Sequence, residues 1–127
     1  MSSLKSQVSG WIGEKVTRIA IFLSLDKKIY HRFHDVIINS PDSTNQLDHV
    51  IISPYGIFVI ETKNISGWIF GSEKDLNWTQ SLNGGRTKYK FQNPLRQNYR
   101  HTKCLSEYLG LDHGVMHSIV FLLGSAN

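Results

Sequence analysis

The sequence predicts a mixed α/β fold in which helices pack against a sheet, in the simplified order helix, four strands, helix, strand. Apolar residues at helical spacing occupy the start of the chain and a stretch near its end. Short apolar runs separated by turn formers lie between them, which is typical of strands. The 127 residues are 40% hydrophobic and 19% charged, which is typical of one globular domain, 1–127. This domain can also be a fragment of a longer chain.

The first half of the chain is expected to hold a helix and three strands. Residues 8–25 have helical spacing, and Glu14 lies on the side opposite their apolar stripe. The strands are expected at 29–39, 46–53 and 56–64. The last two should form a hairpin, because proline and glycine stand second and fourth in the turn that joins them.

The second half is expected to hold further strands around one helix. Short strands at 67–71 and 76–82 flank a polar turn. Together with the three strands of the first half, they give five strands before the second helix, one more than in the order stated above. Asn93 should cap a helix that starts at Pro94 and ends at Gly110. Its buried stripe is expected to consist of Leu95, Tyr99, Thr102 and Leu109. A last apolar strand is expected at 117–123.

The composition excludes several classes of protein. The single cysteine, Cys104, excludes an internal disulfide and a cysteine-rich zinc site, and fits a reducing compartment. The chain starts without the apolar segment of a secretory signal. Its longest apolar run, 119–123, is far too short to cross a bilayer. We therefore expect a cytoplasmic location and no membrane partner.

Positive charge is concentrated in one part of a chain whose net charge is +4. The cations of this stretch are Arg86, Lys88, Lys90, Arg96, Arg100 and Lys103. Tyr89, Phe91 and Tyr99 lie among them, as in surfaces where cations meet phosphates and rings stack on bases. The stretch is equally compatible with a solvated loop and the outer face of a helix. Trp68 can likewise be a core residue or a ring that stacks on a ligand.

The strand expected at 56–64 begins with apolar residues and ends with an acid and a base. Glu61 and Lys63 point to the same side, because side chains alternate along a strand. Ending a core strand with a carboxylate and an ammonium is costly unless they pair or bind something. This strand end is therefore the first candidate site.

The hairpin register decides whether a second carboxylate joins this site. If Ser53 lies opposite Gly56, Asp48 falls directly opposite Glu61, with Cβ atoms about 5 Å apart. An Asp, a Glu and the nearby Lys63 can together hold a divalent cation and a water. A bulge at the glycine would shift the register by one and place the carboxylates on opposite faces. A salt-bridged strand end without chemistry is the other alternative.

Several motifs occur together in a fixed order. They are Gly13-Glu14, Gln46-Leu47-Asp48-His49-Val50, Gly56-Ile57-Phe58-Val59-Ile60-Glu61-Thr62-Lys63-Asn64 with Gly67, Trp78, and Asn93-Pro94 with Gln97. In this combination, from Gly13 to Leu123, the chain resembles the nuclease-related domain (NERD). That domain is itself similar to the PD-(D/E)xK superfamily of restriction endonucleases and Holliday-junction resolvases. Leu47 stands where the superfamily's name has a proline, a position that varies.

The resemblance implies a restriction-endonuclease-like mixed central sheet flanked by helices, and it implies roles for the site residues. Asp48, Glu61 and the main-chain carbonyl of Thr62 would bind Mg²⁺ or Mn²⁺, and Lys63 would position the attacking water and offset developing charge. Glu14 would reach the same cleft through a metal-bound water, although its position equally allows plain exposure.

Two further implications concern the second helix. Gln97 would contact the water, the metal or the phosphate near the helix N-terminus, where free N–H groups favour anions; it can also be a surface glutamine. Arg100 and His101 would contact backbone phosphates. The implied function is a metal-dependent nuclease acting on nucleic acid, with DNA expected. The alternative is a nucleic-acid-binding or interaction module that keeps the nuclease-like fold without turnover.

Overall fold

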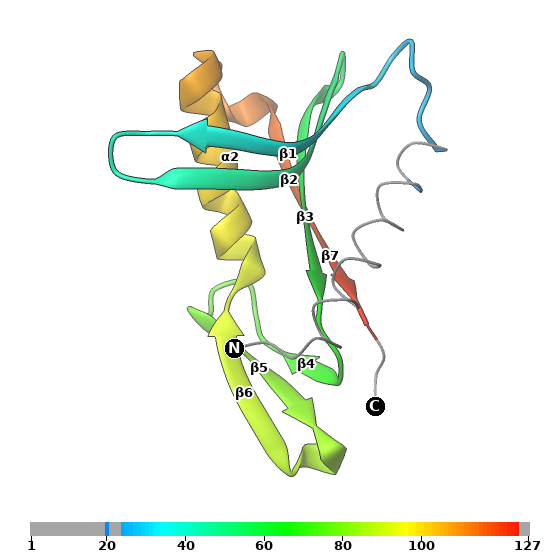
Figure 1. Ribbon diagram of the computed structural model, residues 1–127, viewed down its shortest axis with the longest axis vertical. Coiled ribbons are helices and arrows are strands. Elements are labelled where there is room, and N and C mark those ends of the chain that lie inside the picture. Colours follow the sequence, from blue (N-terminus) through cyan, green and yellow to red (C-terminus); the bar gives the residue numbers. More distant parts are fainter. Residues whose placement is uncertain (1–19, 21–23, 125–127) are drawn as a thin grey trace.

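The computed structural model describes residue 20 and residues 24–124 as seven strands, one long helix and two short 3₁₀ turns (Figure 1). The strands are β1 His31–Asn39, β2 Thr44–Ser53, β3 Gly56–Asn64, β4 Trp68–Phe70, β5 Asn77–Leu82, β6 Thr87–Gln92 and β7 Met116–Leu123. The helix, α2, spans Pro94–Leu109. The α/β class is therefore confirmed. Of the helix expected at 8–25, the part before residue 20 lies outside the described residues, while Ala20 and Ser24 are helical.

The expected number and grouping of the strands are wrong. Six strands precede α2, and they divide between two sheets, one with the order β1-β2-β3-β7 and a smaller one with the order β4-β5-β6. The strand not expected from the sequence is β6, which lies in the basic stretch that suits a nucleic-acid surface and a solvated loop equally. Its alternation of Lys88 and Lys90 with Tyr89 and Phe91 has the period of two that indicates a strand.

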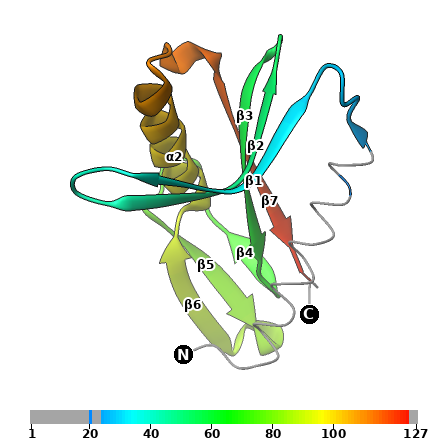
Figure 2. The ribbon, with the colours of Figure 1, turned by 45° about the horizontal axis from the view of Figure 1, so that its top comes forward.

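The four-stranded sheet carries α2 on one face. Its strands are antiparallel except β7, which runs parallel to β3 after the chain has passed through the small sheet and α2. Figures 1 and 2 show α2 alongside this sheet, with the small sheet beyond the N-terminal end of the helix. The core between helix and sheet consists of Ile38, Leu47, Val50, Ile57, Val59, Leu105 and Met116.

The ends of α2 lie where the sequence predicts them. The Asn93 side chain accepts a hydrogen bond from the backbone N–H of Leu95 at 2.9 Å, Pro94 opens the helix, and Gly110 ends it at a φ of 67°. The Asn93 amide also donates to the carbonyl of Asp75 at 2.8 Å. This residue therefore ties the start of the helix to the turn between β4 and β5.

The buried face of α2 differs from the predicted stripe. Tyr99 and Leu109 are exposed, and polar side chains, Asn98 and His101 among them, are buried in their place. The Asn98 amide donates to Val59 O at 2.9 Å and to Ser118 Oγ at 2.7 Å. The helix thus docks on β3 and β7 partly through hydrogen bonds, which an analysis of apolar spacing does not detect.

The hairpin of β1 and β2 separates from β3 partway along the two strands. The pairing of β2 with β3 ends at His49 and Ile60, and the β1–β2 ladder is interrupted at Asp35, whose φ is 53°. Beyond this point the hairpin crosses over α2, as Figures 1 and 2 both show. Leu47 consequently packs in the same core as Leu105 of the helix.

Where β2 separates from β3, the Asp48 side chain replaces the β2 backbone as hydrogen-bond acceptor for β3. The Asp48 carboxylate oxygen Oδ2 accepts from the backbone N–H of Thr62 at 3.0 Å and from the Thr62 hydroxyl at 3.1 Å. In a continued ladder this N–H would have donated to Leu47. Because strand N–H groups in a protein interior need acceptors, the carboxylate stabilises the opening between the two strands.

Replacing Asn98 with alanine should destabilise the fold. The side chain is fully buried, and its loss leaves Val59 O and Ser118 Oγ without this donor. We expect the free energy of unfolding to fall by about 2 to 4 kcal/mol in urea titrations. The exposed Glu107→Ala variant on the same helix should change it by less than about 0.5 kcal/mol. An equally small effect of Asn98→Ala would contradict the docking role.

Replacing Asp48 should separate its role as a hydrogen-bond acceptor from its charge. Asp48→Ala removes the acceptor for Thr62 and should lower the free energy of unfolding by about 1 to 3 kcal/mol. Asp48→Asn keeps an acceptor oxygen and relieves repulsion with Glu61, so the metal-free variant should be as stable as the parent or more stable. Thermal melts in EDTA measure both. If the asparagine variant is as unstable as the alanine variant, the charge itself is structural.

Candidate active site

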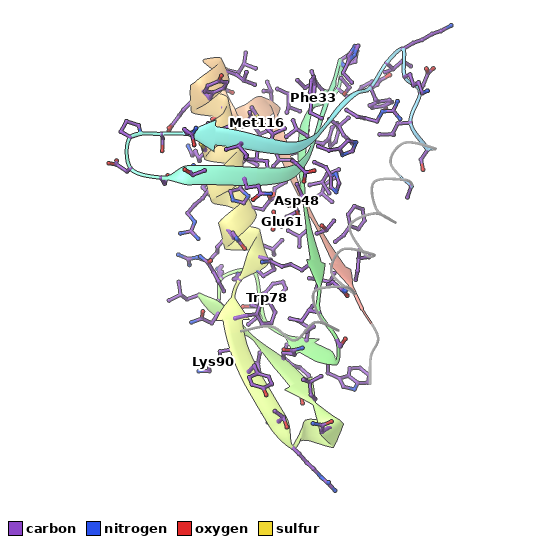
Figure 3. The ribbon with its side chains drawn as sticks, viewed as in Figure 1. Phe33, Asp48, Glu61, Trp78, Lys90 and Met116 are labelled. Carbon is purple, nitrogen blue, oxygen red and sulfur yellow. The ribbon has the colours of Figure 1, made fainter. Side chains whose placement is uncertain are left out.

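The predicted acidic residues lie at the opening between β2 and β3. The hairpin pairs Ser53 with Gly56 and continues in register to His49 with Ile60, without a bulge. The pairing ends one residue before Asp48 and Glu61, so the ladder itself does not pair the two carboxylates. Asp48 instead bonds to Thr62, and its charge acts on His101, which lies beside Glu61. Figure 3 labels Asp48 and Glu61 near one another at this point. Of the two hairpin alternatives, the structure has the register without a bulge.

Glu61 is the more buried of the two carboxylates. It continues the row of Ile57 and Val59, which pack beneath α2, and 7% of it is exposed. Asp48 is half-buried. Of the two carboxylates, Asp48 is therefore the more accessible to solvent.

The helix contributes His101 next to Glu61. The side chain is buried, with Nδ1 3.7 Å from Oε2 of Glu61. Burial lowers the pKa of His101, the Asp48 charge opposes this, and Arg100 and Lys63 lower the pKa further. The neutral imidazole is therefore favoured next to Glu61. The expected contact of His101 with backbone phosphates stays a prediction, and its place beside Glu61 was not expected because it depends on how α2 docks.

Lys63 lies near the carboxylates without pairing with them. It is half-buried two residues after Glu61 on the same side of β3, and its charge reaches His101. Within the described part of the chain, no ion pair joins Lys63 to Asp48 or Glu61. Of the salt-bridged alternative, the pairing of Lys63 with Asp48 or Glu61 is absent among the described residues, while Glu61 lies beside His101.

Thr62 presents its backbone to the opening. Its N–H donates to Asp48 on the side where β2 has left. The N–H and C=O groups of one strand residue point to the same edge, so the Thr62 carbonyl is directed there as well. Asp48 and Thr62 thus meet where β2 leaves β3, and Glu61 is the residue before Thr62. Metal binding by these three residues stays a prediction.

Of the remaining predicted catalytic residues, the structure describes Gln97 but not Glu14. Gln97 is half-buried and lies one helical turn before His101, so both belong to the same side of α2. Glu14 lies outside the described residues. Among residue 20 and residues 24–124, no group of three or more His, Cys, Asp or Glu side chains is arranged to hold a metal ion. A site here would be of the open kind, with few carboxylates and several waters, which suits Mg²⁺.

The predicted nucleic-acid-binding residues occupy two neighbouring elements. Arg86, Lys88 and Lys90 lie in or next to β6, and all are exposed. Arg96 and Arg100 are exposed one turn apart on α2 and line a surface pocket of about 360 Å³ together with Gln92, Tyr99, Glu73, Leu76 and Leu95. The cations are thus spread along a surface that leads from the small sheet to the helix.

A larger apolar pocket, of about 530 Å³, lies away from these residues. It is lined by Ile51, Phe58, Ile60 and Ile119, on the sheet face opposite α2. None of the described residues that line it carries a charge. In the described part of the chain, no helix has the length and apolar character needed to span a membrane.

Comparison with known proteins places the chain in a family. The family model described as "Nuclease-related domain" matches residues 9–123. A Bacillus anthracis protein described as uncharacterized is 43% identical over 108 residues, which cover 82% of this chain. The chain spans 50% of that relative's length. No solved structure matches. The chain belongs to the nuclease-related domain family.

Proposed function

We propose that this domain is a metal-dependent nuclease that hydrolyses phosphodiester bonds of nucleic acid, with DNA as its substrate. The observation that supports the proposal is the contact of Asp48 with Thr62 where β2 leaves β3, directly between Glu61 and Lys63 along β3. Membership of a nuclease-related family supports it.

The donor atoms around the opening fit a hard divalent cation. Asp48 and Glu61 would hold Mg²⁺ or Mn²⁺ together with the carbonyl of Thr62, since such ions prefer oxygen and retain several waters. A bound ion would polarise the scissile phosphate and lower the pKa of its water. Asp48 already uses Oδ2 to hold Thr62, which orients its carboxylate and keeps it beside β3.

The chain's own cation would act on the transition state. Lys63 forms no ion pair with the site's carboxylates among the described residues, so its ammonium can approach the attacking water and the developing phosphorane charge. Gln97, one turn from His101, would contact the water or the phosphate. The neutral His101 would restrict the Glu61 carboxylate without adding charge. Glu14 would join the site from the first helix.

Substitution of the site residues should abolish cleavage without unfolding the domain. Glu61→Ala and Lys63→Ala should each lower the rate of DNA hydrolysis by at least about 10²-fold, because each removes a group that acts on the reacting phosphate. Gel assays with plasmid and single-stranded DNA in Mg²⁺, Mn²⁺ or EDTA would measure this. Lys28→Ala, in the turn before β1, is the control for loss of a lysine and should cleave as the parent does.

The binding of the cation can be measured apart from turnover. Calorimetric titration of Mg²⁺ should show heat of binding to the parent protein, and Asp48→Asn should weaken the affinity by at least about 10-fold, because a charged ligand becomes neutral. Calcium is a useful second ion, since it binds oxygen ligands too. Salt-sensitive DNA binding with neither cation binding nor cleavage would favour the non-catalytic module instead.

A further inference from the structure

We propose that one face of the β4-β5-β6 sheet binds an unpaired nucleic-acid strand, with bases stacked on Trp68 and Phe70 and phosphates held by Lys88 and Lys90. The inference deepens the proposed function, on which it rests, because it names single-stranded nucleic acid as the substrate class. We call this surface the platform.

Strand register brings these four side chains to one face. Trp68 lies opposite Ser81, which lies opposite Lys88. Phe70 is likewise aligned with Lys90, through Thr79. Residues directly opposite one another share a face, and residues two apart on a strand share it too. The platform thus has two aromatic rings on one edge strand, two lysines on the other, and two small hydroxyl residues between them.

Both rings of the platform are open to solvent, whereas on the other face Tyr89 is exposed and the remaining two rings are not. Trp68 is 61% exposed and Phe70 is 59% exposed. On the opposite face, Trp78 and Phe91 are half-buried and pack edge to face with ring centroids 6.3 Å apart. The small sheet therefore uses one face for packing and leaves its other pair of aromatic rings exposed at an energetic cost, which indicates a ligand.

The spacing suits a strand of nucleic acid. Trp68 and Phe70 are separated by two residues, roughly 7 Å along β4, so each ring can take one base. The lysines lie roughly 10 Å away across two strand spacings. The central side chains, Thr79 and the buried Ser81, are small and do not project between the rings and the cations.

The charge of the surface selects an anionic partner. The residues on this face, Trp68, Phe70, Asn77, Thr79, Ser81, Lys88, Lys90 and Gln92, include two lysines and no carboxylate. Exposed rings combined with cations are the arrangement that binds single strands, because stacking requires bases that a duplex keeps paired and hidden. An apolar protein partner would not require the lysines.

The platform continues toward the candidate active site. Gln92, at the end of β6, lines the same surface pocket as Arg96 and Arg100 of α2, where Glu73 is the one carboxylate of the lining. Arg100 is adjacent to His101, which lies 3.7 Å from Glu61. A strand held on the platform would therefore extend along a basic path to the opening between β2 and β3.

Binding without turnover tests the platform. Fluorescence anisotropy in EDTA would compare a labelled oligothymidylate with the same strand paired to oligoadenylate. Trp68→Ala and Phe70→Ala should each weaken single-strand binding by at least about 5-fold and leave duplex binding within about 2-fold. Replacing Lys88 and Lys90 together with glutamine should reduce the slope of log K against log salt by roughly 1.4, about 0.7 for each phosphate contact.

Matched controls separate the platform from general effects. Tyr108→Ala removes another highly exposed ring, on α2, and Lys27→Gln with Lys28→Gln removes two lysines before β1. Both should bind the oligonucleotide as the parent does. Circular dichroism melts check that each variant folds, which we expect because the substituted side chains are exposed.

The outcomes distinguish this inference from the proposed function. Unchanged single-strand affinity of Trp68→Ala and Phe70→Ala, or an equal loss for duplex, overturns the platform even if the protein cleaves DNA. Ring-dependent binding of the single strand supports the platform even if the parent cleaves nothing, in which case only the nuclease proposal fails. Glu61→Gln, which should lose cleavage yet bind in EDTA as the parent does, connects the two measurements.

Discussion

The structure depends on the hydrogen bond between the Asp48 carboxylate and the backbone N–H of Thr62. Two adjacent strands cannot separate in a protein interior without leaving backbone groups that need partners. Asp48 supplies a partner from its side chain, which allows β1 and β2 to turn away and cover α2. The same separation creates the opening that Glu61 and Lys63 border. Fold and candidate site thus share one cause, and Asp48 is expected to serve both.

The docking of α2 is the second constraint, and it is unusually polar. Asn98 hydrogen-bonds to β3 and β7, and His101 lies against Glu61, where a typical amphipathic helix would place aliphatic side chains. Hydrogen bonds are directional, so they fix the rotation and register of the helix more narrowly than apolar contacts do. This rotation also decides which face of α2 carries Gln97 toward the strands and which presents Arg96 and Arg100 to solvent.

The small sheet adds a second surface to this arrangement. Asn93 joins it to the start of α2 through the carbonyl of Asp75, so the helix connects the two sheets. One face of the small sheet packs Trp78 against Phe91, and the other presents Trp68 and Phe70 beside lysines. In the proposed function the place where β2 leaves β3 supplies the chemistry, and in the further proposal this face of the small sheet holds the polymer.

The sequence by itself determined the α/β class, the ends of α2 and the hairpin of β2 and β3, because these follow from local signals: proline and glycine in the turn, an asparagine cap, and alternation along a strand. It also indicated Asp48, Glu61 and Lys63 as candidates for one group, through one of the two registers that the hairpin allows and through the resemblance to a family. Only the tertiary structure decided that the strands form two sheets, that His101 is buried beside Glu61, and that Trp68 is exposed. Those features arise from contacts between segments distant along the chain, and local spacing carries no information about which distant segment will cover a side chain.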